Sequence, residues 1–253
     1  MKYDGFFFND ELMMLDFRLH HVYNHVDKII IVEGDRKFDG TPKESVLRQN
    51  WNLVKWAENK IIHTIVKLDE YPTDRWANER KQRDGWLNDV TPQEGDVFFI
   101  TCVDEIVRTD LYDGIVAPVE ASLVLDNYYY YFNCKDVGTN PTHPMTVVFS
   151  EVSDTPNHIW EKCSSGKSMM VPDCGWHFSY LGGAETIKRK LSDFSHAEYD
   201  TDKIKDAIAD NLANLRDPFG RDEHKFKIVK LDDHPGYLMQ NLDKYKEYIH
   251  ASA

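Results

Sequence analysis

The first half of the chain alternates short apolar runs with longer segments in which apolar residues recur every three or four positions. The short runs predict strands, and the longer segments predict helices. In residues 11–26, for example, Leu12, Leu15, Leu19 and Val22 share one helical face. The predicted strands are residues 5–8, 28–33, 61–68 and 96–101, and the predicted helices are residues 11–26, 44–59 and 74–87. Strands that alternate with helices need crossover connections, so this half predicts a mostly parallel sheet with helices on both faces.

The second half is less regular and richer in aromatic residues. Strands are predicted at residues 123–134 and 146–149, and helices at residues 185–191, 202–215 and 238–249. Residues 150–172 contain Ser, Gly, Pro and Asn and predict a long loop. No repeat or low-complexity linker separates the two halves. The simplest prediction is a single α/β domain, with a regular half at residues 1–110 and an irregular, aromatic-rich half at residues 111–253.

Composition and charge narrow the function classes. The chain has 253 residues, 42% hydrophobic and 29% charged, which is a globular composition with enough length for a substantial core. Its 43 Asp and Glu against 30 Lys and Arg give a net charge of −13. A surface of that sign repels polyphosphate and disfavours sequence-independent binding of nucleic acid. An anionic ligand would need a metal ion, a few basic side chains or a helix N-terminus to offset this field.

The spacing of the cysteines and the absence of long apolar runs indicate the cellular compartment of the protein. Cys102, Cys134, Cys163 and Cys174 are far apart and form no C-x-x-C pair, which predicts reduced thiols. The first residues lack the apolar stretch of a signal peptide, and no segment approaches the roughly 20 apolar residues of a membrane span. We therefore expect a soluble cytoplasmic protein.

Acidic residues follow three of the four strands predicted in the first half. In an open parallel sheet, ligands bind at the carboxyl ends of the strands, where the strand order reverses. Residues 9–11 follow the first strand, Glu33 ends the second, and Asp104 and Glu105 follow the fourth. A single carboxylate there often only caps the next turn. Two at a buried strand exit are costly to desolvate without a cation, which favours Mg²⁺ or Mn²⁺ holding a diphosphate.

Two further segments carry candidate binding residues. Glu79 and Arg83 lie four positions apart on a predicted helix, so Arg83 forms either an ordinary ion pair or a contact with phosphate or ribose. His177 lies between large aromatic residues and is either a packing residue or a metal ligand. On the second interpretation Trp176 and Tyr180 stack on a sugar ring. No Ser/His/Asp triad, Walker loop or G-x-G-x-x-G pattern can be assigned.

Several sequence blocks occur together along nearly the whole chain. They are Tyr-Asp-Gly-Phe-Phe-Phe-Asn-Asp-Glu-Leu at residues 3–12, Arg-Leu at 18–19, Val-Asp-Lys through Val-Glu at 26–33, Phe-Asp-Gly-Thr-Pro-Lys at 38–43, Gln-Arg at 82–83, Val-Asp-Glu-Ile at 103–106, Gly-Trp-His-Phe-Ser-Tyr at 175–180, Phe-Ser-His-Ala-Glu at 194–198, Pro-Gly-Tyr-Leu at 235–238 and Asn241. Together and in this order, they resemble glycosyltransferase family 17, the β-1,4-mannosyl-glycoprotein β-1,4-N-acetylglucosaminyltransferase-like family.

The resemblance implies a GT-A-like fold, with a nucleotide-sugar-binding half at residues 1–110 and an acceptor-binding half at residues 111–253. It implies inverting transfer of GlcNAc from UDP-GlcNAc to a hydroxyl group of a glycan acceptor. Mn²⁺, or Mg²⁺, would be held by Asp104, Glu105 and His177. The residues implied on the donor side are Asn9, Glu33 near the uridine or ribose, Arg83 near the diphosphate, and Lys190 as a phosphate contact.

An inverting transferase also needs a base for the acceptor hydroxyl group. Asp173, Glu185 and Glu198 are all available for this role. Glu185 ranks first because it opens a helix beside a Gly pair at residues 182–183.

The chain departs from the family pattern in two places. The family usually has Asp-Val-Asp-Glu-Ile-Pro where this chain has Cys-Val-Asp-Glu-Ile-Val at residues 102–107. Either Asp104 and Glu105 suffice as ligands or metal binding is weak, and the alternative function is a non-catalytic carbohydrate-binding protein. Golgi members also carry a membrane anchor, and its absence predicts a microbial or viral enzyme with another acceptor. A metal-dependent phosphoesterase, a third possibility, usually needs a denser His/Asp cluster.

Overall fold

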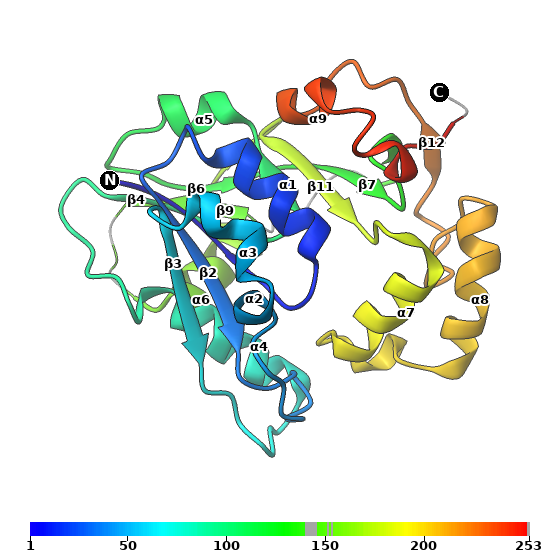
Figure 1. Cartoon of the computed structure of the whole chain (residues 1–253), viewed down its shortest axis with the longest axis horizontal. Helices are drawn as coiled ribbons and strands as arrows, with labels where there is room; N and C mark the ends of the chain where they lie inside the picture. Colours follow the sequence, from blue (N-terminus) through cyan, green and yellow to red (C-terminus); the bar gives the residue numbers. More distant parts are fainter. Residues whose placement is uncertain (140–145, 151, 153, 252–253) are drawn as a thin grey trace. The chain divides into compact units, whose positions relative to one another are not determined.

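The computed structural model describes residues 1–139, 146–150, 152 and 154–251, and the chain divides into two compact units. Unit 1 comprises Met1–Leu125 and His143–Gly175, and unit 2 comprises Asp126–Thr142 and Trp176–Ala253. The fold is mixed α/β and contains two sheets (Figure 1). The functional division into a donor half and an acceptor half stays a prediction.

Unit 1 contains a seven-stranded sheet in the order β10-β6-β9-β4-β1-β2-β3. Its strands are β1 (Lys2–Phe7), β2 (Lys28–Gly34), β3 (Ile61–Val66), β4 (Val97–Cys102), β6 (Glu120–Leu123), β9 (Thr146–Phe149) and β10 (Met169–Val171). The short strand β5 (Glu105–Val107) follows β4. Strands β4, β1, β2 and β3 are parallel, whereas β9 is antiparallel to both β4 and β6. The sheet is therefore mostly parallel, as predicted.

The helices of unit 1 connect these strands. They are α1 (Leu12–Val22), α2 (Val46–Gln49), α3 (Trp51–Val54), η1 (Lys55–Ala57), α4 (Arg75–Asp84), η2 (Gly85–Leu87), α5 (Thr109–Gly114), α6 (Pro156–Lys162) and the π-helical turn η3 (Cys163–Lys167). The predicted alternation of strands and helices in the first half is confirmed. The predicted helix 44–59 is divided, because Asn50 has a non-helical backbone (φ −113°, ψ 23°) between α2 and α3.

Adjacent residues of β1 show that helices cover both faces of this sheet. Asp4 contacts Arg18 of α1. A Cβ atom added to Gly5 would lie 2.6 Å from the ring of Trp86 in η2. Successive side chains of a strand point to opposite faces, so α1 lies on one face and η2 on the other. Both faces of β2 are accordingly buried, as its β-branched sequence predicts: Ile29, Ile30, Ile31 and Val32 are all 0% exposed.

Unit 2 is built on four strands in the order β12-β8-β7-β11. Its elements are β7 (Asp126–Tyr129), β8 (Cys134–Asp136), β11 (Gly175–Ser179), α7 (Gly183–Asp193), η4 (Ala197–Tyr199), α8 (Asp202–Ala213), β12 (Phe226–Ile228), α9 (Gly236–Gln240) and η5 (Lys246–Tyr248). Helices α7 and α8 lie side by side (Figure 1). Its core contains Tyr129, Tyr130 and Tyr180 packed on Ile187, Leu191 and Ile208.

Three predictions for the second half are wrong. The aromatic run 123–134 is not one strand, because Tyr130 has a left-handed backbone (φ 68°) between β7 and β8. The predicted loop 150–172 contains α6, η3 and β10. The predicted helix 238–249 is replaced by two short helices, α9 and η5. Strand 146–149 and helices α7 and α8 are confirmed, and all four cysteines are free thiols.

The close approach of η2 to β1 predicts a cost for any side chain at position 5. The Gly5→Ala variant would bring a methyl group within 2.6–2.9 Å of three atoms of the buried Trp86 ring. Overpacking of this kind costs about 1–3 kcal/mol. We expect urea unfolding to show that loss for Gly5→Ala. Gly114→Ala is the control, because nothing lies within 4 Å of its added Cβ atom; an equal loss there would contradict the prediction.

Candidate active site

The carboxyl ends of β1 and β4 lie side by side where the strand order of the unit 1 sheet reverses. The chain passes from β1 to β2 and β3 on one side and returns to β4 on the other side of β1. The last residue of β1, Phe7, is paired in register with the last residue of β4, Cys102. The segments that follow, residues 8–11 and 103–105, therefore leave the same edge of the sheet. Open α/β sheets bind ligands at this position.

A tight turn after β4 carries the two carboxylates predicted to bind a metal ion. Asp104 and Glu105 are 4% and 0% exposed, so the predicted buried strand exit is confirmed. Glu105 Oε2 accepts a hydrogen bond of 2.7 Å from the backbone N–H of Cys102, which closes the turn. Two successive buried carboxylates repel each other, and a nearby positive charge or a cation relieves that repulsion. Their oxygen atoms are the donor type that Mg²⁺ and Mn²⁺ prefer.

Arg18 of α1 holds both ends of this turn. Its Nη1 donates to the carbonyl oxygens of Cys102 at 2.8 Å and of Glu105 at 2.6 Å. Its Nε and Nη2 donate to the two carboxylate oxygens of Asp4 at 2.8 and 2.6 Å. Nη2 also donates to Thr101 Oγ1 at 2.6 Å. Arg18 and Asp4 are both 0% exposed, so the five donors of the guanidinium group are used inside the protein.

Two hydroxyl groups complete the network around Asp4. Tyr112 donates to Asp4 Oδ1 at 2.8 Å, and Thr101 Oγ1 donates to the Gly5 carbonyl oxygen at 2.9 Å. Burial lowers the pKa of Arg18, but the charge of Asp4 and its hydrogen bonds, with smaller contributions from Tyr112 and Glu105, together outweigh burial and raise that pKa overall. Burial and then the Asp4 charge raise the pKa of Tyr112 well above its ordinary value. At neutral pH Arg18 is therefore charged, and Tyr112 is a neutral donor.

A second side chain of α1 contacts the same stretch of backbone. His21, one helical turn after Arg18, has its Nε2 2.8 Å from the Val107 carbonyl oxygen. Burial lowers the pKa of His21 to about 4. At neutral pH the uncharged ring therefore donates from Nε2. Helix α1 thus contacts carbonyl groups at positions 102, 105 and 107.

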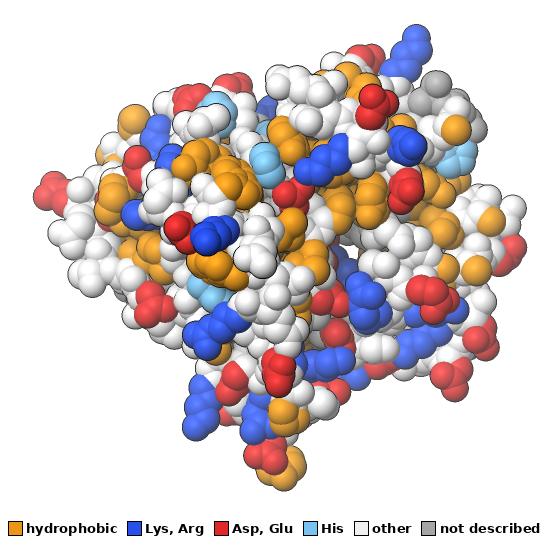
Figure 2. Space-filling view, viewed as in Figure 1, with side chains coloured by type: hydrophobic (Ala, Val, Ile, Leu, Met, Phe, Trp, Pro, Cys, Tyr) orange, Lys and Arg blue, Asp and Glu red, His pale blue; other side chains and the backbone are white. Residues whose placement is uncertain are grey.

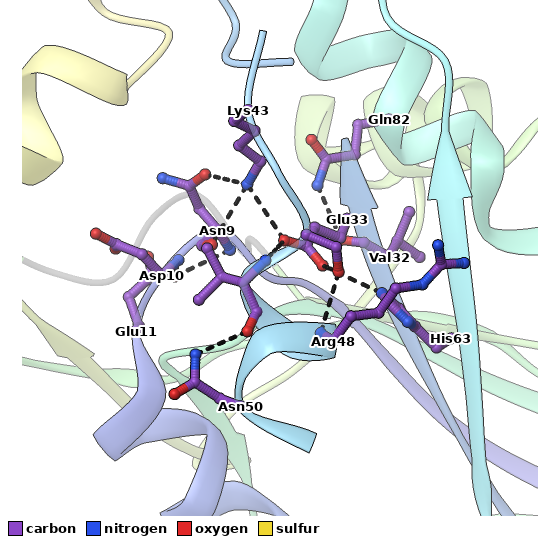
Figure 3. Close-up of polar contacts among 12 residues, drawn as sticks. Asn9, Asp10, Glu11, Val32, Glu33, Lys43, Arg48, Asn50, His63 and Gln82 are labelled. Carbon is purple, nitrogen blue, oxygen red and sulfur yellow. Dashed lines mark hydrogen bonds and ion pairs between the residues drawn. The ribbon is translucent and has the colours of Figure 1, made fainter. Parts of the chain in front are cut away.

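Lys43 joins the exit of β1 to the loop that follows β2. Its Nζ donates to Asn9 Oδ1 at 2.5 Å and to the Asn9 carbonyl oxygen at 3.3 Å, and lies 3.7 Å from Glu33 Oε1 (Figure 3). Glu11 Oε2 accepts from the backbone N–H groups of Asn9 and Asp10 at 3.2 Å. The polar residues after β1 therefore stabilise one another and position the Asn9 side chain beside Lys43.

Glu33 is fully buried at the end of β2. Its Oε1 accepts from the backbone N–H of Val46 at 2.6 Å, and its Oε2 accepts from Ser45 Oγ at 2.6 Å and lies 3.1 Å from His63 Nε2 (Figure 3). Burial raises the pKa of Glu33, but His63, Ser45 and the charge of Lys43 lower it below its ordinary value overall. Protein donors thus contact both carboxylate oxygens. A direct contact of Glu33 with uridine or ribose stays a prediction.

Arg83 lies beside the last residue of β1. It pairs with Glu79 Oε1 at 2.6 Å, donates to Asn157 Oδ1 at 2.8 Å, and places its guanidinium group 5.0 Å from the Phe7 ring centroid and 4.0 Å from that of Trp160. The pair with Glu79, one of the two interpretations of Arg83, forms, but it is buried: Arg83 is 4% exposed. The contacts connect α4 to α6 and to β1. The contact of Arg83 with a diphosphate stays a prediction.

The thiol of Cys102 lies in the turn itself and is partly buried. Burial, followed by the charges of Glu105 and Asp104, raises the pKa of this thiol well above its ordinary value. Cys102 is therefore uncharged at neutral pH and adds no third negative charge beside the two carboxylates.

Four of the residues predicted from the sequence belong to unit 2. His177 in β11 lies 3.3 Å from Asn127 Oδ1 through Nδ1 and 2.9 Å from Ser179 Oγ through Nε2. Among the described residues, no three His, Cys, Asp or Glu side chains form a group that could hold a metal ion. The ligand set of Asp104, Glu105 and His177, drawn from both units, stays a prediction.

The other three unit 2 residues lie on or after α7. Glu185, in the first turn of α7, pairs with Lys188 at 2.9 Å, and its side chain is 87% exposed. Lys190 lies 5.6 Å from the centroid of the Tyr180 ring. Glu198 Oε1 is 2.5 Å from His196 Nδ1, and this hydrogen bond lowers the pKa of Glu198.

Asp173 is the base candidate that belongs to unit 1. Its Oδ1 accepts from Arg108 Nη2 at 2.7 Å, and its carbonyl oxygen accepts from Arg108 Nε at 3.0 Å. Arg108 directly follows β5, which begins at Glu105. Asp173 is thus tied to the segment that leads out of the Cys102–Glu105 turn.

The expectation that the aromatic rings of residues 176–180 stack on a sugar is wrong. Trp176, Phe178 and Tyr180 are 4%, 1% and 8% exposed. Trp176 Nε1 donates to the Asp233 carbonyl oxygen at 2.8 Å, and Phe178 packs on Phe132 within unit 2. These rings build the core of unit 2.

Asp4, Arg18 and Tyr112 were not predicted as site residues. The sequence nevertheless contains a signal: Asp4 interrupts an apolar strand, and Arg18 lies among the apolar residues of α1. A charged residue in each of two buried elements predicts an ion pair between them. The sequence does not predict that this pair also holds the Cys102–Glu105 turn, because that contact depends on the order of the strands in the sheet.

On the face shown in Figure 2, acidic and basic side chains are interspersed. Because the net charge of the chain is −13, an anionic ligand would rely on local groups such as Lys43 and Arg83, or on a bound cation.

These features define an α/β protein with a carboxylate-bearing turn at the ligand-binding edge of its sheet. The family model described as glycosyltransferase family 17 matches residues 1–249. The chain therefore belongs to glycosyltransferase family 17, and this membership supports a transferase that uses a sugar donor and an acceptor.

A solved structure titled "inositol-1-phosphate CTP transferase from T. maritima" is similar over 86% of this chain and 98% of that chain, with 8% sequence identity and a TM-score of 0.37. No curated protein sequence matches the chain. In the part of the chain that the structure describes, no helix has the length and apolar character needed to cross a membrane.

The lowered pKa of His21 predicts a specific loss of stability in acid. Below pH 6.5 the unfolded chain protonates this residue, whereas the folded protein resists protonation until about pH 4. The free energy of unfolding should therefore fall by up to about 3 kcal/mol between these pH values. His21→Gln keeps a donor for Val107 but cannot titrate, so its urea unfolding should show a smaller fall. An equal fall in the wild-type protein and in His21→Gln would contradict the assignment.

Proposed function

We propose that this family 17 protein transfers GlcNAc from UDP-GlcNAc to a hydroxyl group of a glycan acceptor, with inversion at the anomeric carbon and with a divalent metal ion. One observation carries the proposal: two buried carboxylates, Asp104 and Glu105, leave β4 at the edge where the strand order reverses. Family membership supports the transferase class. The donor sugar follows from the resemblance of the sequence blocks to the N-acetylglucosaminyltransferase-like members.

The donor set of the turn fits Mn²⁺ or Mg²⁺. Asp104 and Glu105 would hold the ion through carboxylate oxygens, with His177 as the proposed third ligand. When bound, such an ion offsets the negative charge that develops on a departing diphosphate. The charge of Arg18 interacts with that of Glu105, and this lowers the cost of keeping two carboxylates together before the ion arrives.

On the donor side we propose roles for Asn9, Glu33, Arg83 and Lys190. Arg83 lies beside Phe7 and would face the diphosphate, with Lys190 as a second phosphate contact. Glu33 holds Ser45 and Val46 at the start of α2, and Lys43 connects it to Asn9. Glu33 would thus shape the ribose-side loop.

Transfer with inversion needs one carboxylate to accept the acceptor hydroxyl proton while the hydroxyl oxygen attacks the anomeric carbon. Asp173 pairs with Arg108, and Glu185 pairs with Lys188. The hydrogen bond from His196 lowers the pKa of Glu198 and so weakens it as a base. Glu185 stays the first candidate because it lies in the first turn of α7, beside the Gly pair at residues 182–183.

Cys102 favours a second candidate function, a non-catalytic carbohydrate-binding protein. A thiol replaces the first acidic residue of the family pattern and leaves the turn one carboxylate short. The two functions differ in their dependence on Asp104. A carbohydrate-binding protein should keep its glycan affinity without this carboxylate, whereas a transferase should lose metal-dependent turnover.

Calorimetric titration with UDP-GlcNAc tests the proposal directly. We expect binding that is stronger with Mn²⁺ than without it, and a loss of about tenfold or more in Asp104→Asn, equivalent to about 1.4 kcal/mol. Asp110→Asn is the control, because this carboxylate is exposed on α5. Absence of donor binding, together with absence of UDP release from UDP-GlcNAc, would reject the proposal. Glycan binding that survives in Asp104→Asn would support the carbohydrate-binding alternative.

Replacing the thiol tests whether metal binding is limited by the missing carboxylate. Cys102→Asp adds a negative charge beside Asp104 and Glu105, so it should lower the melting temperature of the metal-free protein. Mn²⁺ should then raise the melting temperature more than in the wild type, because tighter binding gives more stabilisation. Cys102→Ser is the matched control and should show the wild-type shift. Equal Mn²⁺ shifts in all three proteins would show that position 102 does not contribute to the site.

A further inference from the structure

Arg18 is placed to control the shape of the turn that carries Asp104 and Glu105. One nitrogen atom, Nη1, contacts the carbonyl oxygens of Cys102 and Glu105, which are the first and last residues of the turn. Asp104 lies between these two fixed points. The separation of the ends is therefore fixed by this buried guanidinium group together with the hydrogen bond from the Cys102 N–H to Glu105 Oε2.

Other side chains fix the guanidinium group itself. Asp4 receives Nε and Nη2 in a bidentate contact, and Thr101 receives the other Nη2 donor. Tyr112 in turn donates to Asp4 Oδ1. A planar group held at all three nitrogens has one orientation, which a flexible ammonium group would not reproduce.

We propose that Arg18, held by Asp4, is a positioning residue for divalent-cation binding by Asp104 and Glu105. The inference rests on the proposed metal-dependent function. Arg18 and its contacts with Asp4 are called the clamp below. The clamp keeps the turn in its cation-binding shape before the ion arrives, so less ordering of the turn is needed when the ion binds. Residues that orient metal ligands in this way typically change metal affinity by 10–100-fold when they are replaced.

The charge of Arg18 and its contacts with the turn have opposite expected effects on cation affinity, so an experiment can distinguish them. Removal of a positive charge near the carboxylates should strengthen cation binding. Loss of the clamp should weaken it. Arg18→Lys keeps the charge opposite Asp4 but has three donors in place of five, so it tests geometry alone.

His21 provides a matched control on the same helix. Like Arg18 it is buried and contacts a backbone carbonyl group, but that group belongs to Val107, beyond the turn. His21→Gln should lower stability without changing the ends of the turn. Tyr112→Phe removes one donor to Asp4 and leaves the Asp4–Arg18 pair, so it loosens the clamp mildly.

The experiment measures the affinity for Mn²⁺ alone from the electron paramagnetic resonance signal of the free aqueous ion. Circular dichroism and thermal unfolding are recorded on the same proteins. We expect about tenfold weaker Mn²⁺ binding in Arg18→Lys, a loss of about two- to threefold in Tyr112→Phe, and no change in His21→Gln. The Mn²⁺ affinities of folded Arg18→Lys and folded His21→Gln should differ even if the two variants have the same melting temperature.

Unchanged Mn²⁺ affinity in folded Arg18→Lys would overturn the inference. Equal weakening in His21→Gln would also overturn it, because affinity would then follow stability. If Arg18→Lys does not fold, the Mn²⁺ affinities of Tyr112→Phe and His21→Gln test the inference. Weaker binding in Tyr112→Phe alone supports it, and equal affinities overturn it. A wild-type protein that binds no Mn²⁺ would reject the metal-dependent function and this inference together, whereas wild-type binding without any effect of the clamp variants rejects the inference alone.

Discussion

The buried ion pair between Asp4 and Arg18 is the interaction on which the proposed site depends. Two opposite charges with 0% exposure are costly to desolvate, and their geometry must compensate. Here the contact is bidentate, and the remaining guanidinium donors satisfy Thr101 and two carbonyl groups of the turn after β4. The same pair joins β1 to α1 and shapes the turn that carries Asp104. Stability of the sheet and geometry of the site are therefore coupled.

The fold of the first half could be predicted because local pattern and tertiary structure agree there. The β-branched run of β2 is buried on both faces, and the apolar spacing of residues 12–22 gives α1. The second half could not be predicted as well. Its aromatic run contains Tyr130 with a positive φ, a conformation fixed by packing that no residue pattern reveals. Trp176 and Phe178 alternate with polar residues, and this pattern alone cannot distinguish a ring in the core from one at a sugar site.

The candidate site likewise has features that could be predicted from the sequence and features that could not. The strand-end position of Asp104 and Glu105 could be predicted, because carboxyl ends of parallel strands are defined by the order of elements. The contacts of Glu33 and Arg83 could not, since Ser45, Val46, His63 and Asn157 meet them only in the folded chain. Arg18 was missed for the same reason. Its partners are 14, 83, 84 and 87 residues away in the sequence.

The central claim is that the turn after β4 binds the divalent ion of a nucleotide-sugar transferase. A crystal structure of the protein with Mn²⁺ and UDP, with an anomalous difference map at a wavelength sensitive to manganese, tests this claim most directly. The claim predicts a manganese peak at the carboxylate oxygens of Asp104 or Glu105, with the UDP diphosphate beside it at the shared end of β1 and β4. A manganese peak elsewhere, or UDP bound away from this edge, would contradict it.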